Sequence, residues 1–293
     1  MKRTEKVEFF GFLNVDKPSG LTSSTVVNKS KWLSGVPCGH MGTLDPLASG
    51  VLPVGVGNAT RLFDYFLQKE KEYIAEFTFG VSSDTLDTTA ELTQAGAIPT
   101  AKEIESVLPT FFGDIMQMPP KYSAKNVNGK RGYDLARAGV DFELQAQKVH
   151  IYGIELLGEA ERENTYRFKI RCGGGTYIRS LARDIAEKLE TNAVMSALRR
   201  TQSGYFKIEE SIPFAVLEAE PSVQELQKYI IPTETVLSYE TITLTPNAYT
   251  RVFQGVPTTV DYPTGLYKIY QDGAFYGIAE VADGRVKIKT KLC

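Results

Sequence analysis

The sequence predicts an α+β fold, in which helices flank a mixed or antiparallel central sheet and a small β domain follows at the C-terminal end. Two observations support this prediction. Strand-like segments and capped amphipathic segments are interspersed over residues 1–231, whereas 232–293 shows mainly strand-like alternation. The 293 residues are also enough for one large domain and one small domain. We therefore expect domains at 1–231 and 232–293.

The elements of the large domain follow from local patterns. The predicted strands are 10–15, 51–57, 73–79, 149–157 and 165–171, each an apolar or alternating run. Predicted helices begin at Ser23 or Ser24, at Asn58 or Thr60, at Thr100, after the glycines at 173–175, and at Ser222. Thr100 and Ser222 are each followed three residues later by glutamate, which is the capping-box pattern. Residues 82–94 read as a loop, and their aspartates are typical of a solvated turn.

The tail has its own signals. Strands are expected at 242–244, 266–270, 275–281 and 286–289, and Asp272-Gly273 and Asp283-Gly284 mark turns between the last three. These signals predict the small β domain.

Composition limits the classes of protein. Hydrophobic residues make up 42% and charged residues 23%, and no apolar run approaches 20 residues, so no membrane span is expected. The charged N-terminus is not followed by a signal-peptide core, which favours the cytoplasm. Three cysteines and two histidines favour neither a disulfide framework nor a zinc site.

One stretch stands out, Gly39-His40-Met41-Gly42-Thr43-Leu44-Asp45-Pro46-Leu47-Ala48-Ser49-Gly50. It places a single carboxylate, Asp45, in a glycine-bounded turn braced by proline, immediately before an apolar strand. Such a loop on a rigid scaffold is suited to catalysis. An Asp-Pro pair is also a common turn former, and the pattern by itself slightly favours that interpretation.

The run from Gly39 to Leu62 closely resembles the active-site motif of bacterial tRNA pseudouridine synthases of the TruB type. The resemblance implies the pseudouridine synthase fold with a PUA-like C-terminal domain. It also implies isomerisation of uridine 55 in the tRNA T-loop, with Asp45 as the nucleophile and without cofactor or metal. Arg179, at the end of Gly-Thr-Tyr-Ile-Arg, is implied to pair with Asp45.

Further positions follow from the same resemblance. Tyr73, in Lys-Glu-Tyr, is implied to lie beneath the flipped uracil, and Leu198, in Leu-Arg-Arg, to line its pocket. His40 is implied to fill the space that the base leaves in the loop, and Tyr177 to contact the substrate. The basic neighbours of Leu198, Arg199 and Arg200, are candidates for phosphate contacts or for an ordinary cationic surface.

The segment 119–141 is basic, although the whole chain has a net charge of −2. We expect RNA contacts from Lys121, Tyr122, Lys125, Lys130 and Arg131, since lysines meet phosphates and tyrosines stack on bases. Composition favours a solvated hairpin equally. The resemblance implies a mobile thumb that folds over the T-loop, and a monomeric enzyme whose partner is tRNA.

Two other functions fit the sequence. One is an RNA-binding module or tRNA-folding chaperone that performs no chemistry. The other is a glycosidase that releases the base, which would require a second carboxylate and a path for water. No such partner for Asp45 stands out in the sequence.

Overall fold

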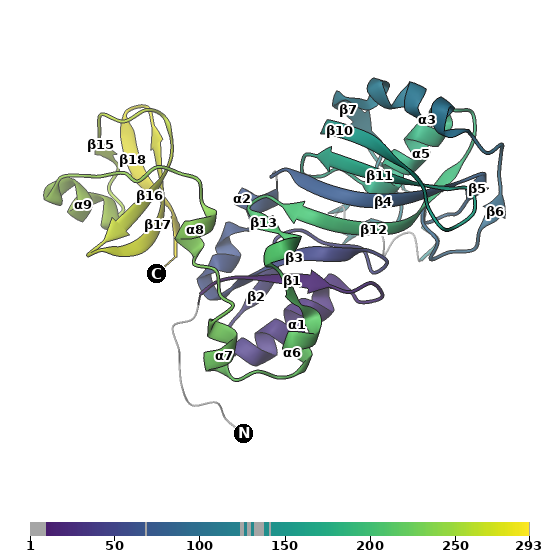
Figure 1. Ribbon diagram of the computed structural model, residues 1–293. Coiled ribbons are helices and arrows are strands. Elements are labelled where there is room, and N and C mark those ends of the chain that lie inside the picture. Colours follow the sequence, from purple (N-terminus) through teal and green to yellow (C-terminus); the bar gives the residue numbers. More distant parts are fainter. Residues whose placement is uncertain are drawn as a thin grey trace.

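The computed structural model describes residues 10–67, 69–123, 126–127, 130–131, 138–140 and 142–292, with the backbone alone for 126–127 and 130–131. A large sheet runs through the first part of the chain, and a smaller sheet lies apart from it at the C-terminal end (Figure 1). The predicted α+β architecture with a mixed sheet and a small β domain is confirmed.

The large sheet has the order β14-β1-β3-β12-β4-β11-β10-β7, with β2 paired to β3 and β13 paired to β12. Its strands are β1 (Gly11–Lys17), β2 (Cys38–His40), β3 (Ser49–Val56), β4 (Lys71–Phe79), β7 (Gly113–Gln117), β10 (Gln147–Glu159), β11 (Thr165–Cys172), β12 (Ala193–Ser203), β13 (Phe206–Lys207) and β14 (Ile212–Pro213). The β1–β14 and β3–β12 pairs are parallel, and the other pairs are antiparallel. The parallel β3–β12 pair therefore joins the motif strand to the strand that contains Leu198.

Two short hairpins lie outside this sheet. They are β5 (Val81–Ser82) with β6 (Thr93–Gln94), and β8 (Asn126–Val127) with β9 (Lys130–Arg131). The β8–β9 pairing agrees with the hairpin that composition favours within the basic segment.

The described helices lie beside both sheets. They are α1 (Ser23–Ser34), α2 (Phe63–Leu67), α3 (Ala101–Val107), α5 (Ile178–Lys188), α6 (Phe214–Glu218), α7 (Val223–Gln227), α8 (Thr233–Val236) and α9 (Pro246–Phe253), with short 3-10 turns at Gly57–Leu62, Leu108–Phe111 and Ile208–Glu210. Helices α3 and α5 lie together on one part of the sheet, and α1 packs with α6 and α7 at the other (Figure 1). One continuous core joins them, from Leu13 and Val26 to Phe168 and Leu181.

The N-terminal caps of three helices can be compared with the caps that the sequence predicts. Both predicted capping boxes are present, at Thr100 and at Ser222. The expected cap of α1 at Ser23 or Ser24 is wrong, because the Thr22 side chain accepts from the Thr25 N–H. Ser23 instead lies inside the helix and is 3% exposed, which leaves its hydroxyl for another contact.

Glycine is required at position 50, where β3 pairs with Arg200 of β12. Its φ is +101°, and a Cβ there would lie 2.2 Å from the Arg200 carbonyl oxygen. We expect Gly50→Ala to lower the free energy of unfolding by about 3 kcal/mol or more, through backbone strain and a clash with main chain. Chemical denaturation measures this. The control is Gly20→Ala, with φ +90° and open space around the Cβ, and an equal loss in both would contradict the clash.

The small domain consists of α9 with β15 (Thr258–Thr259), β16 (Gly265–Gln271), β17 (Ala274–Ala282) and β18 (Arg285–Lys291). Both predicted Asp-Gly turns are present, with positive φ at Asp272 and Asp283. The strand expected at 242–244 is wrong, since these residues form no strand and the preceding Thr241 forms an isolated bridge to Lys268 of β16. The short β15 on the far side of β18 was not expected.

The small domain is anchored on the large one. The Asn58 amide and the Arg61 guanidinium donate to carbonyls at the end of the chain, those of Leu292 and Lys291, at 2.9 and 2.7 Å. A hydrophobic cluster that includes Phe12 and Leu292 continues this contact. The exact boundary at 231/232 stays a prediction. Within the described ranges, no helix is long and apolar enough to cross a membrane.

Candidate active site

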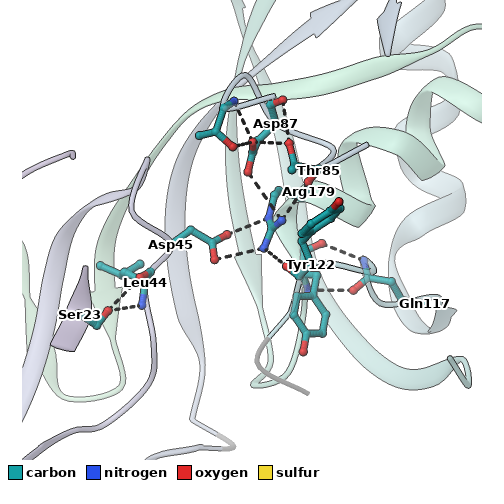
Figure 2. Close-up of polar contacts among 10 residues, drawn as sticks. Ser23, Leu44, Asp45, Thr85, Asp87, Gln117, Tyr122 and Arg179 are labelled. Atoms are coloured by element: carbon teal, nitrogen blue, oxygen red, sulfur yellow. Dashed lines mark hydrogen bonds and ion pairs between the residues drawn. The ribbon is translucent and has the colours of Figure 1, made fainter. Parts of the chain in front are cut away.

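The loop between β2 and β3 holds Asp45 in place through contacts with α1 and β1. The Ser23 hydroxyl accepts from the Leu44 N–H and donates to the Leu44 carbonyl, both at 2.9 Å (Figure 2). The fully buried Lys17 donates to the carbonyls of Pro18, Leu21 and Pro46. Burial lowers the pKa of Lys17 to about 8, and the nearby Asp45 carboxylate opposes this shift. The loop is therefore fixed on both sides of its carboxylate.

Arg179 forms a two-pronged ion pair with Asp45. Its Nε lies 2.9 Å from Asp45 Oδ2, and its Nη2 donates to Asp45 Oδ1 at 3.2 Å (Figure 2). Nη1 donates to the Thr85 carbonyl at 2.9 Å, and Nη2 also donates to the Tyr122 carbonyl at 3.0 Å. The Arg179 side chain is only 7% exposed, which strengthens such charge-assisted contacts.

A second carboxylate, Asp87, faces Arg179 from the loop after β5. Its Oδ2 lies 3.7 Å from Arg179 Nη1, and its Oδ1 accepts from the Thr85 hydroxyl and from the N–H and hydroxyl of Thr89. The interpretation of this loop as a solvated turn is wrong for Asp87, which is 5% exposed. The buried cation of Arg179 is balanced by two carboxylates, and this explains why Asp87 is held in the interior.

Asp87→Asn is expected to slow the reaction roughly tenfold and to leave tRNA affinity unchanged. The amide keeps the shape of the side chain but removes the negative charge, so that Asp45 becomes the one carboxylate paired with Arg179 among the described residues. Single-turnover rates and tRNA dissociation constants measure the two effects. Asp261→Asn, an exposed acid of the small domain, is the matched control. Weaker tRNA binding with an unchanged rate would show that Asp87 does not act through Arg179.

The floor of the site is the face of β4 and β12. Tyr73 and Arg200 are directly paired across these strands, and Leu198 pairs with Ala75. Tyr73 and Leu198 are each 7% exposed. Burial raises the pKa of Tyr73 to about 12, and the neighbouring Arg200 guanidinium works against this shift. The tyrosine thus presents a neutral ring at ordinary pH.

One wall of the site is the start of α5. The buried Gln117 side chain accepts from the Tyr177 N–H at 2.8 Å and donates to the Tyr177 carbonyl at 3.2 Å (Figure 2). The Ser180 hydroxyl donates to the Met118 carbonyl at 2.8 Å. These bonds join the end of β7, where the basic segment begins, to the helix that contains Arg179.

These elements enclose a cavity of about 210 Å³. It is lined by Gly42, Thr43, Leu44, Asp45, Leu67, Lys71, Tyr73, Ser123, Gly175, Thr176, Tyr177, Ile178, Arg179, Met195, Leu198 and Arg200. Five of the predicted site residues, Asp45, Tyr73, Tyr177, Arg179 and Leu198, therefore line the same cavity.

The other predicted residues lie elsewhere. His40 lines a separate hollow between α1 and the start of α2, so the structure does not bring it to Asp45. Lys121 and Tyr122 line a second cavity with Arg183, and the Tyr122 carbonyl accepts from Arg179.

Three predictions in the basic segment depend on side chains that the structure does not describe. Lys125 lies outside the described residues, and Lys130 and Arg131 are described by backbone alone, in β9. Their proposed contacts with RNA stay predictions.

The two arginines after Leu198 do not form a cationic surface. Arg199 pairs with Asp16 at 2.8 Å, and Arg200 is 1% exposed. Arg200 donates to the carbonyls of Val51 and Gly42 instead.

Asp87, Lys71, Gln117 and Arg200 were not recognised as site residues from the sequence. Lys71 had a usable signal, because it lies two residues before Tyr73 in a strand and so shares its face. The described residues contain no group of three His, Cys, Asp or Glu side chains that could hold a metal ion.

Comparison with known proteins identifies the family of the chain. Residues 31–178 match the N-terminal domain of the TruB family pseudouridylate synthases, and 179–238 match the tRNA pseudouridylate synthase B C-terminal domain. The tRNA pseudouridine synthase B of Caldanaerobacter subterraneus subsp. tengcongensis is 38% identical over 96% of this chain and 98% of its own. That of Clostridium kluyveri is 37% identical over 95% and 98%.

Solved structures extend the likeness. A chain in the crystal structure of a Cbf5-Nop10-Gar1 complex superposes with a TM-score of 0.70 at 26% identity, over 97% of this chain and 85% of that chain. A chain of an archaeal box H/ACA Nop10-Cbf5 complex gives 0.68 at 25% identity, over 97% and 86%. With the family match, the near-complete relatives and the shared fold together, the chain belongs to the TruB family of pseudouridylate synthases.

Proposed function

We propose that this enzyme isomerises uridine 55 in the T-loop of tRNA to pseudouridine, with Asp45 as the nucleophile and without a cofactor. The observation that carries the proposal is the Asp45–Arg179 ion pair at the mouth of a cavity whose floor holds a buried tyrosine and leucine. The names of the relatives, tRNA pseudouridine synthase B, support tRNA as the substrate.

The reaction requires one positioned carboxylate and a closed pocket. The N1–C1′ bond must break, the base must turn, and C5 must bond to C1′ without escape of the base. Arg179 contacts both oxygens of Asp45 in the lining of the cavity, holds the carboxylate in place and balances its charge, which suits a nucleophile. The base must be flipped out of the folded tRNA to reach it, and Tyr73 and Leu198 supply apolar surface to receive it.

The arrangement favours isomerisation over base release. A glycosidase would use its second carboxylate to activate water or to protonate the leaving group. The nearest candidate, Asp87, lies on the far side of Arg179, accepts bonds from Thr85 and Thr89, and does not line the cavity. The cavity therefore offers Asp45 as its one carboxylate in the described part of the chain.

Recognition of tRNA is assigned to the basic segment, whose entry is bonded to α5 through Tyr122 and Met118. RNA that binds this segment would act close to Arg179, and hence to the proposed nucleophile. We propose a monomeric, cytoplasmic enzyme.

The test is tritium release from unmodified tRNA labelled at uridine C5. Release that matches pseudouridine at position 55 supports the proposal. Free uracil in the products would identify a glycosidase. Bound tRNA without release would leave a binding protein or folding chaperone.

A further inference from the structure

The floor of the cavity contains two buried cations that have carbonyl partners but no carboxylate. Lys71 is 6% exposed, and its Nζ donates to the carbonyls of Leu67 and Lys69 at 2.8 and 2.7 Å. Arg200 is 1% exposed, and its contacts at 2.7 and 3.1 Å are with the carbonyls of Val51 and Gly42. Neither forms an ion pair with a carboxylate of the described ranges.

This leaves an excess of positive charge in the cavity. Among its described lining residues, Lys71, Arg179 and Arg200 are cations, and Asp45 is the only acid. Asp45 already pairs with Arg179. Burying a charge without a counterion costs free energy. We take the burial of Lys71 and Arg200 without a carboxylate partner in the described ranges as a sign that a bound ligand supplies the opposite charge. An ammonium has three N–H donors, and the described residues account for two of those of Lys71.

The two cations lie beside the ring assigned to the base. Arg200 is the direct cross-strand neighbour of Tyr73, and Lys71 precedes Tyr73 by two residues on the same face of β4. The surroundings are an aromatic ring and buried aliphatic side chains, which suit a flat base better than a hydrated phosphate.

We propose that Lys71 and Arg200 form an electrostatic subsite for the pyrimidine ring, which stabilises the negative charge that the ring acquires when its N1–C1′ bond breaks. The inference rests on the proposed function. When the bond breaks, Asp45 bonds to C1′, and the electron pair of the broken bond stays on N1 and is shared with the ring oxygens. An electron pair at C5 then forms the new bond to C1′ as the bond to Asp45 breaks, the C5 proton leaves to solvent, and N1 gains a proton. Preorganised cations lower the energy of the charged stage.

The ionisation of Lys71 gives this subsite a pH dependence. Burial lowers the pKa of Lys71 to about 8, with the Arg200 charge acting in the same direction. The ammonium is therefore present below pH 8 and is lost as the pH rises through that value. The other groups that face it do not titrate there, since the pKa of Cys172 on β11 is about 11 and that of Tyr73 about 12.

The experiment compares wild type with Lys71→Met, Lys71→Arg and Arg200→Lys, and uses exposed Lys102→Met as the matched loss of charge. Single-turnover tritium release and tRNA dissociation constants are measured at several salt concentrations. We expect Lys71→Met and Arg200→Lys to release tritium at least roughly tenfold more slowly, with unchanged tRNA affinity. Lys71→Arg should stay within about threefold of wild type, since the charge is kept.

The pH profile gives a readout that a purely structural role would not change. Wild-type release should fall above pH 8, and Lys71→Arg should remove this fall. Lys17, whose pKa is also about 8, lies near Asp45, so a fall that persists in Lys71→Arg would overturn the role of Lys71.

Other outcomes are equally decisive. The variants could instead bind tRNA more weakly, with the slope of log affinity against log salt concentration reduced by about one. That result would show a phosphate contact and overturn the subsite. Wild-type rates in every folded variant that binds tRNA would also overturn it. An inactive wild type would refute the proposed function itself, which is a separate result.

Discussion

Asp45→Asn is expected to reduce tritium release roughly 10⁴-fold or more, because the amide cannot act as the nucleophile. The amide is similar in size to the carboxylate, and Arg179 keeps its contacts with Asp87, Thr85 and Tyr122. Folding and tRNA affinity should therefore stay close to wild type. Single-turnover release and a tRNA binding assay measure the two properties separately.

The control for Asp45→Asn is Asp16→Asn, which removes a carboxylate that pairs with Arg199 outside the cavity lining. Release by Asp45→Asn at a rate near wild type would refute the assignment of the nucleophile. Loss of both release and tRNA binding would point instead to a defect in recognition.

Arg179→Gln should have the second-largest effect, since one guanidinium connects the nucleophile, Asp87 and the start of the basic segment. We expect the rate to fall roughly 10²- to 10³-fold, as when a preorganised donor is removed from an active site. Stability should also fall by about 3 kcal/mol, because the buried Asp87 loses its cation. Single-turnover release and chemical denaturation measure these losses.

A double variant separates the two consequences of Arg179→Gln. Adding Asp87→Asn removes the uncompensated charge, so stability should recover in part while the rate stays low. Arg171→Gln, at an exposed arginine paired with Glu70, is the control and should change neither property appreciably. If stability does not recover, then Asp87 does not depend on Arg179 for its charge balance.

Local sequence signals were sufficient for many of the elements, whereas the choice of Asp45 as the proposed nucleophile came from the family resemblance. The strand at β4, the capping boxes at Thr100 and Ser222, and the Asp-Gly turns each depend on residues a few positions apart. Such short-range chemistry is encoded in the order of residues. The long motif around Asp45 likewise identified the family.

Local signals failed where a side chain had a distant partner. Ser23 resembles a helix cap by position, but its hydroxyl is used by Leu44 across 21 residues. Asp87 resembles part of a solvated turn, but Arg179 lies opposite it. The adjacent residues Arg199 and Arg200 resemble a basic surface in the sequence. In the strand, Arg199 pairs with Asp16 and Arg200 is buried.

By itself, the sequence determined part of the succession of strands and helices, the loop that carries Asp45, and the family to which the chain belongs. The strands β2, β7, β12, β13 and β14 of the large sheet were not predicted. The resemblance implied the pair of Arg179 with Asp45, but only the tertiary structure decided the other charge contacts, such as Asp87 with Arg179 and Asp16 with Arg199. The strand order places β12 between β3 and β4, and the register pairs Tyr73 with Arg200. Those contacts depend on the pairing of both strands in one buried sheet. Burial strengthens the interaction between charges that meet and raises the cost of those that do not, and neither effect can be read from neighbouring residues in the sequence.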